Sequence, residues 1–242
     1  ADGVDPDAGL RGFREVSDAL GETHWYLRLL RDERAAAERM ARVLASSRFA
    51  TELLLRAPEA VGMLGGDDSD EHARFSTRHE LEEEERAALG RHGDAESVVA
   101  ALRAMRRREL FRIAVADLGA EVGGGADTDQ TLPVETIGAG VTAVAQASVL
   151  GIYELARRAV AAEHGDLDVE FGVLAMGRLG GHEMAYSSDA DVMYVYRNGS
   201  GTDEAAAARF ALAVAQEMHR LVVLPSREPP LPCVLVALLP DR

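Results

Sequence analysis

The sequence predicts an α+β fold, in which a helical amino-terminal half is followed by a small α/β unit. Before residue 165, apolar residues recur at helical spacing. A β-branched apolar run at 169–176 then stops at glycines, and a second apolar run occupies 192–196. The two runs are expected to be strands, and the loop of glycines, serines and aspartates at 177–191 is expected to connect them.

The helical half is predicted from apolar stripes and from the signals that start and stop helices. Residues 1–22 carry Gly, Asp and Pro without a clear period, so they are expected to form an irregular lead-in. The charged segment 65–80 is expected to be a loop, and the glycine-rich run 123–129 a linker. Helices are expected over residues 25–44, 49–55 and 134–163, and a further long helix, capped by Asp94, is expected to continue to residue 118.

One further helix and one further strand are expected after the loop at 177–191. Thr202 is expected to cap a helix whose apolar stripe ends before Pro225. Residues 231–238 are apolar and are expected to form the last strand.

The composition limits the classes of function. With 242 residues and 47% hydrophobic content, the chain can fill a core. A net charge of −15 argues against binding to a nucleic-acid backbone, which needs an excess of cations. No apolar run approaches the length of about 18 residues that suggests a membrane span, and no targeting segment is recognisable. The chain is therefore expected to be cytoplasmic and to bind no membrane.

Two scarce residue types exclude further classes. Cys233 is the only cysteine, so neither an intrachain disulfide nor a cysteine-rich zinc site can form. The chain contains no lysine at all. Because a Walker A phosphate loop and a Schiff-base enzyme both need a lysine, the sequence excludes both.

The loop at 177–191 carries the best candidates for chemistry. If the second strand begins inside it, Asp189 and Asp191 project to one side and Ala190 and Val192 to the other. Two carboxylates in one small space repel unless a cation or a shared proton lies between them. Magnesium suits such a pair, since it takes one or two carboxylates and completes its shell with water and phosphate oxygens. Asp189 and Asp191 are therefore expected to be metal ligands and catalytic residues.

The same loop is expected to hold the phosphates of a nucleoside triphosphate. Glycines let the backbone approach a phosphate closely, and serines offer hydroxyl groups. A dinucleotide-binding loop does not fit, because the glycines read G-x-x-G-G and a strand follows. The expected nucleotide-binding residues are Gly177, Arg178, Gly180, Gly181, Ser187 and Ser188.

Several charged residues allow two interpretations. Arg178 either reaches a phosphate or is solvated, and Glu183 is interpreted as an acceptor that organises the loop rather than as a third metal ligand. The cluster Arg106–Arg108, with Arg103 and Arg112, is interpreted as an exposed, ion-paired helix face rather than a docking patch.

Residues 177–191 resemble the motif G-[KR]-L-G-G-x-E-[LM]-x-x-x-S-D-x-D of the glutamine synthetase adenylyltransferase and deadenylylase family. This family is a branch of the polymerase-β-like nucleotidyltransferase fold. Segments 24–31, 53–59 and 106–112 also resemble family segments, so the similarity covers most of residues 20–230. Full-length members carry two related units, and this chain is similar to one unit with its preceding helices. Its flanking segments resemble the carboxy-terminal, adenylylating unit of an actinobacterial member.

The resemblance implies a fold, a reaction and partners. Residues 1–126 would be a helical region, and residues 127–242 a polymerase-β-like nucleotidyltransferase unit. The implied reaction is magnesium-dependent transfer of AMP from ATP to a tyrosine hydroxyl of glutamine synthetase, which regulates nitrogen assimilation. A nitrogen-signalling regulatory protein is a further expected partner. Two alternatives stay open: a non-catalytic fragment that binds nucleotide or glutamine synthetase, and the phosphorolytic deadenylylating unit.

The carboxy-terminal sequence departs from the family pattern. Members are expected to continue after Pro229–Leu231 into a strand of the form D-x-D-L-R-P, which supplies a third carboxylate. Here residues 232–239 contain no acid. The sequence therefore predicts a catalytic unit that is truncated or frame-disrupted, with two of its three metal-binding carboxylates.

Overall fold

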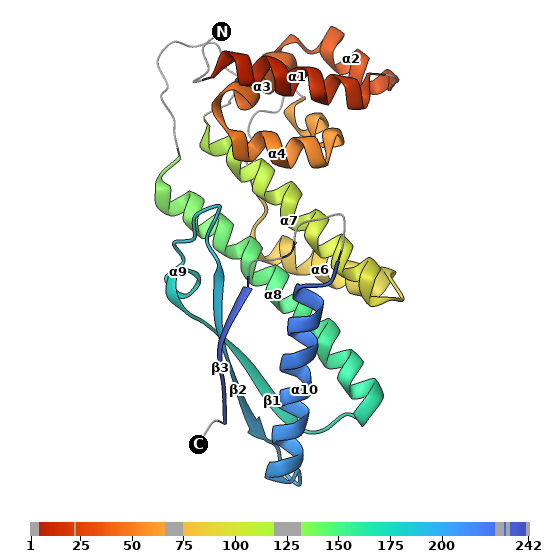
Figure 1. Cartoon of the computed structure of the whole chain (residues 1–242), viewed down its shortest axis with the longest axis vertical. Coiled ribbons are helices and arrows are strands. Elements are labelled where there is room, and N and C mark those ends of the chain that lie inside the picture. Colours follow the sequence, from red (N-terminus) through yellow and green to blue (C-terminus); the bar gives the residue numbers. More distant parts are fainter. Residues whose placement is uncertain are drawn as a thin grey trace. The chain divides into compact units, whose positions relative to one another are not determined.

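The computed structural model describes residues 5–21, 23–65, 75–118, 132–225, 230 and 233–240 (Figure 1). The chain divides into two compact units, each built from two segments. Unit 1 comprises Ala1–Ser76 and Arg107–Ile137, and unit 2 comprises Thr77–Arg106 and Gly138–Arg242. The predicted linker at 123–129 lies outside the described residues. The predicted division at residues 126 and 127 falls in the same stretch and stays a prediction.

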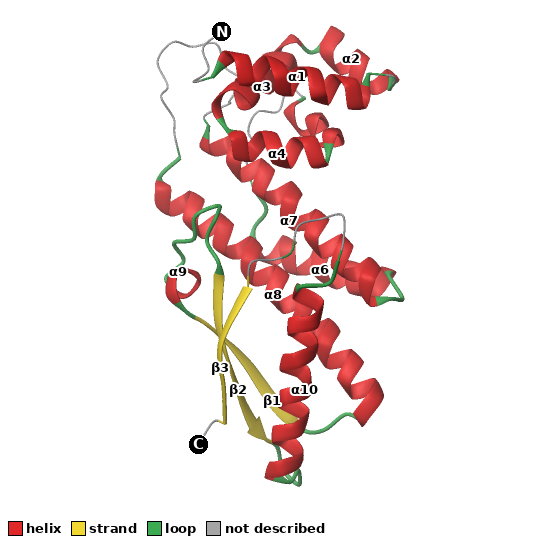
Figure 2. Cartoon of the chain, in the orientation of Figure 1, coloured by secondary structure: helices red, strands yellow, loops and turns green. Residues whose placement is uncertain are grey.

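The elements confirm the α+β class. In chain order they are α1 (Pro6–Leu20), α2 (His24–Asp32), α3 (Arg34–Ser46), α4 (Arg48–Arg56), the 3₁₀ helix η1 (Pro58–Leu64), α6 (Arg78–Arg91), α7 (Ala95–Asp117), α8 (Val134–His164), β1 (Val169–Ala175), α9 (Gly177–Gly180), β2 (Ala190–Asn198), α10 (Glu204–Val222) and β3 (Cys233–Pro240). The described strands all follow residue 168, and Figure 2 shows them in yellow, side by side.

The irregular lead-in predicted for residues 1–22 is wrong, because α1 fills most of it. Asp5 caps this helix by accepting a hydrogen bond from the amide of Ala8 at 3.0 Å, and Pro6 supplies the fixed φ of the first helical residue. Close packing against α3 explains the glycine at position 9, because a Cβ there would come within 2.7 Å of the Ala45 Cβ. The glycines that suggested a loop therefore allow two helices to pack closely.

The helix predicted over 25–44 is two helices. Glu33, with φ −120° and ψ 78°, ends α2 and begins α3. The apolar stripe continues through this break, with Tyr26, Leu29 and Met40 all buried in unit 1. An apolar stripe indicates only which face of a helix is buried. It therefore did not reveal a break at Glu33, because α2 and α3 bury the same face on both sides of the break.

The interpretation of the arginine cluster as an exposed face is wrong for two of its members. Arg103 and Arg107 are buried. The guanidinium of Arg103 donates to the carbonyl oxygens of Val222 at 2.7 Å and Leu224 at 2.8 Å, at the carboxyl end of α10. Arg112 makes the expected ion pair, at 3.1 Å to Glu109, but Arg112 is only partly exposed and Glu109 is buried. Arg103 thus satisfies carbonyl groups that the end of a helix leaves without partners.

Unit 2 contains a three-stranded sheet in the order β1-β2-β3. Strands β1 and β2 are antiparallel, whereas β2 and β3 are parallel and are joined through α10. Asp203 caps α10 by accepting from the amide of Ala206 at 3.1 Å, one residue after the predicted cap, Thr202.

Helices α8 and α10 cover one face of this sheet. Tyr153 of α8 stacks on Phe171 of β1 with ring centroids 5.4 Å apart, and Phe171 contacts Tyr194 of β2. Arg157 of α8 lies over the ring of Phe210 of α10. On the opposite face, Leu174 is exposed. Among the elements that the structure describes, these two helices thus lie on the sheet face opposite to Leu174.

Helix α8 is long and apolar enough to cross a membrane by length and composition alone, a feature that the sequence reasoning did not single out. Yet 67% of its most apolar stretch is buried inside the protein, as in the core helix of a folded domain. This observation is weak evidence for a membrane span.

A buried acid in unit 2 should make stability depend on pH. Glu85 of α6 is 4% exposed, and its Cγ lies 2.9 Å from where a Cβ on Gly151 of α8 would be. Burial first, and then the nearby Glu154, raise the pKa of the Glu85 carboxyl from 4.5 to about 7. Since the folded state holds this proton more tightly, the contribution of Glu85 to stability is fully present below about pH 4.5 and is lost as the pH rises through about 7.

Replacing Glu85 by glutamine should remove this dependence and raise the free energy of unfolding at pH 8 by about 2 kcal/mol. Urea denaturation of both proteins at pH 5 and pH 8 measures the effect. The exposed Glu83, replaced in the same way, is the control. A Glu85→Gln protein whose stability changes with pH as much as that of the unchanged chain would contradict the assignment.

Candidate active site

The glycines of the loop at 177–191 fold into α9, a single helical turn that follows β1. Gly177 has φ +49°, in the left-handed region that favours glycine. A Cβ on Gly180 would come within 2.5 Å of the Ala175 carbonyl oxygen, so no larger residue fits there without a shift of the backbone. Leu179 is buried and anchors the turn. Both glycines are thus required by the backbone, whatever the loop binds.

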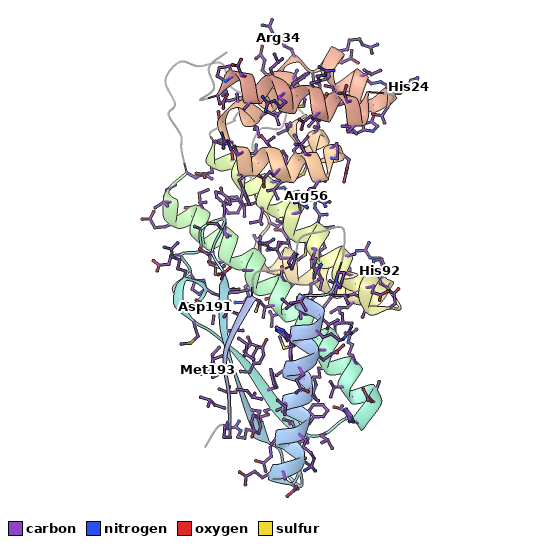
Figure 3. The ribbon with its side chains drawn as sticks, viewed as in Figure 1. His24, Arg34, Arg56, His92, Asp191 and Met193 are labelled. Carbon is purple, nitrogen blue, oxygen red and sulfur yellow. The ribbon has the colours of Figure 1, made fainter. Side chains whose placement is uncertain are left out.

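Asp191 lies at the beginning of β2, where Figure 3 labels it above Met193. Ala190, Val192 and Tyr194 are buried on one side of the strand, which confirms the predicted alternation. Asp191 points to the opposite side and is partly exposed. A Cβ on Gly177 would lie 3.0 Å from Asp191 Oδ2. The structure therefore brings the Asp191 carboxylate against the first residue of α9.

The other predicted site residues lie before β2 or on and just after α9. Ser187 and Asp189 are exposed and precede β2. The Ser188 hydroxyl accepts from the Ala185 amide at 2.9 Å, which closes a turn and still leaves its own proton to donate. Arg178 and Gly181 lie on and just after α9, and both are exposed. Their contact with a nucleotide stays a prediction.

Glu183 and His182 shape the loop between α9 and β2. A Cβ on Gly181 would lie 3.2 Å from the Glu183 Cγ, so the Glu183 side chain folds back over its own loop. His182 has φ 57°, which is uncommon for a residue other than glycine. The sequence reasoning missed this left-handed residue, since only its place after two glycines hinted at a tight turn.

The donor set suits a cation that arrives with a phosphate. Among the residues that the structure describes, no group of three or more His, Cys, Asp or Glu side chains gathers in a way that could hold a metal. Asp189 and Asp191 alone would leave most of an octahedral shell to water and substrate oxygens, as magnesium often does. Asp189 and Asp191 are thus the acids of this loop that could contribute to such a shell, and their binding of magnesium stays a prediction.

Strand β3 runs beside Asp191 without supplying an acid. In the parallel register, Cys233 pairs with Ala190 and Val234 pairs with Asp191. Burial, together with the negative charge of Asp191, raises the pKa of the Cys233 thiol to about 11. Cys233 is therefore protonated at neutral pH and is a poor nucleophile.

Comparison with known proteins gives the family. The family described as glutamate-ammonia ligase adenylyltransferase matches residues 37–241. The chain belongs to the glutamate-ammonia ligase adenylyltransferase family. It is 50% identical over 237 residues to a bifunctional glutamine synthetase adenylyltransferase/adenylyl-removing enzyme of Streptomyces avermitilis. It is 47% identical to the protein of the same description from Streptomyces coelicolor, and 38% identical to that from Mycolicibacterium smegmatis.

Each of these matches covers 96% of this chain. The chain spans only 23% of the length of each Streptomyces relative and 22% of the Mycolicibacterium one. It thus matches one section of each of these longer relatives. The membership of this family that the resemblance of residues 177–191 implied is therefore confirmed.

Proposed function

We propose that unit 2 is part of a nucleotidyltransferase unit that binds ATP with magnesium and transfers AMP to a tyrosine hydroxyl of glutamine synthetase. The observation that carries the proposal is the position of Asp191, whose carboxylate lies against α9. A hard anionic ligand next to a glycine turn offers one place for a cation and another for phosphate oxygens. The relatives named above, described as glutamine synthetase adenylyltransferases, support this choice of reaction.

In the proposed reaction, the tyrosine oxygen attacks the α-phosphorus of ATP. A bond forms between them, the bond from the α-phosphorus to the bridging oxygen breaks, and pyrophosphate leaves with that electron pair. Asp189 and Asp191 would hold magnesium, which would neutralise charge on the phosphates. The α9 turn and Ser188 would orient the phosphates in line with the incoming oxygen. The hydroxyl proton passes to solvent, and the nucleophile belongs to the protein substrate.

Intact-mass measurement tests the proposal directly. The chain is incubated with ATP, magnesium and unmodified glutamine synthetase, and a gain of one adenylyl group per subunit supports it. Incubation of adenylylated glutamine synthetase with phosphate tests the reverse, phosphorolytic reaction. If neither mass changes while magnesium-dependent ATP binding is measurable, the chain is a nucleotide-binding section without transfer activity. An absence of both binding and transfer would overturn the proposal.

Replacing Asp191 by asparagine should weaken magnesium-dependent nucleotide binding by roughly tenfold or more, because the change removes one anionic ligand and keeps the shape. Binding without magnesium should change much less. Calorimetric titration with a non-hydrolysable ATP analogue, with magnesium or with EDTA, separates the two. Glu163→Gln removes the same charge from the exposed end of α8 and is the control. Equal losses with and without magnesium would count against the metal assignment.

A further inference from the structure

Helix α8 supports the loop that leads from α9 to β2. A Cβ on Gly138 would lie 3.2 Å from the Glu183 Cα and 3.5 Å from the His182 carbonyl oxygen. Such a contact is with backbone, which cannot rotate away as a long side chain can. A glycine inside a helix lowers its stability relative to alanine, and this close approach gives Gly138 a packing reason. The absence of a side chain at Gly138 therefore determines how near the loop lies to the helix.

A threonine one turn further along α8 ties the loop to the helix. Thr142 is fully buried, and its hydroxyl donates to the Gly138 carbonyl oxygen at 2.7 Å. The Thr142 hydroxyl oxygen in turn accepts from the amide of Met184 at 3.4 Å. Met184 is itself buried, so water does not readily replace this partner. One hydroxyl thus links the helix backbone to the loop backbone.

These two contacts fix one end of a short segment, and the core fixes the other. After Met184, the turn closed by Ser188 leads to Asp189 and then to Ala190, which is fully buried at the beginning of β2. Asp189 lies five residues beyond Met184 in the sequence. Because the segment is short and held at both ends, a displacement of the Met184 backbone would therefore also displace Ser188 and Asp189.

We infer that Gly138 and Thr142 are positioning residues, which act through the 182–184 backbone to place Ser188 and Asp189 for the magnesium–nucleotide complex. This inference rests on the proposed function. Neither residue is proposed to touch the nucleotide. Their effect is on the geometry of the ligands, so it should show most in the magnesium-dependent part of binding.

The helix offers a matched control for a merely structural role of Thr142. Ser148 is also buried in α8, and its hydroxyl donates to the Val144 carbonyl oxygen at 2.8 Å, four residues back. Thr142 makes the same kind of bond to its own helix and, in addition, accepts from Met184. Comparing Thr142→Val with Ser148→Ala therefore isolates the contact with the loop.

Titration of the chain with a non-hydrolysable ATP analogue, with and without magnesium, tests the inference. Thr142→Val should weaken magnesium-dependent binding by roughly tenfold, because the Met184 amide loses its buried acceptor. Thr142→Ser keeps the hydroxyl and should bind like the unchanged chain, as should Ser148→Ala. Gly138→Ala should weaken binding, whereas Gly90→Ala should not, since nothing lies within 4 Å of a Cβ at Gly90.

Hydrogen exchange of the peptide covering residues 177–189 gives an independent readout. Thr142→Val should speed exchange there, and Ser148→Ala should not. If the unchanged chain shows no magnesium-dependent binding, the proposed function fails, and exchange alone decides whether Thr142 holds the loop. If Thr142→Val and Ser148→Ala behave alike in both measurements, or if binding falls equally with and without magnesium, the inference is overturned.

Discussion

Replacing Val234 by aspartate is expected to create a third carboxylate beside Asp191 and to strengthen the binding of magnesium with nucleotide. Val234 pairs with Asp191 in the register of β2 and β3, so the two side chains share a sheet face on strands about 4.8 Å apart. Val234 is 46% exposed, so replacing it removes little buried apolar surface. If AMP transfer is measurable, its rate should rise by about a hundredfold or more, which is typical of one added electrostatic element at a reacting centre.

The control is Leu239→Asp, on the same strand and equally exposed at 46%, but paired with Val195 rather than with Asp191. Without magnesium, Val234→Asp should lower the melting temperature, because two facing carboxylates repel. Adding magnesium should reverse that loss for Val234→Asp and not for Leu239→Asp. A similar magnesium response in both variants would show that position 234 does not share a site with Asp191.

Replacing Arg103 by methionine should cost about 3 kcal/mol of the free energy of unfolding, because it leaves buried carbonyl groups at the end of α10 without a donor. The Arg103 guanidinium donates to the carbonyl oxygens of Val222 and Leu224 from a buried position. Chemical denaturation of the unchanged and substituted chains, followed by circular dichroism, measures the loss.

Arg91→Met is the matched comparison, because Arg91 also donates to a helix carbonyl, that of Ala87, but does so in solvent. It should change stability by less than about 0.5 kcal/mol. A loss of comparable size in both variants would mean that burial does not give the Arg103 contacts their strength.

The sequence predicted most helices and all three described strands because their signals are local. Asp94 accepts from the Ser97 amide at 2.8 Å at the start of α7, as its cap position predicts. The alternation around Asp191 likewise follows from the strand period of two residues. Helix α1 was missed because its glycines were interpreted as loop signals, although Asp5 and Pro6 together form a helix start.

The failures at Arg103, Gly138 and Thr142 share one physical cause, namely contacts between residues far apart in the sequence. Arg103 lies within a run of charged residues typical of an exposed face, and only its contacts with α10 explain its burial. Thr142 and Gly138 carry no mark in the sequence that connects them with Met184 or Glu183. For the site, the sequence therefore indicated Asp191 and the glycine turn, but not the helix that supports the loop.

The mixed pairing of the sheet has a consequence for the order of folding. Strands β1 and β2 are antiparallel and joined by the loop that carries the candidate site, so they can pair as soon as both have left the ribosome. Strand β3 is parallel to β2 and can pair only after the whole crossover through α10 has been made. Of the described residues paired with the beginning of β2, those of β3, including Val234, are therefore synthesised last, and we expect them to pair after β1 and β2.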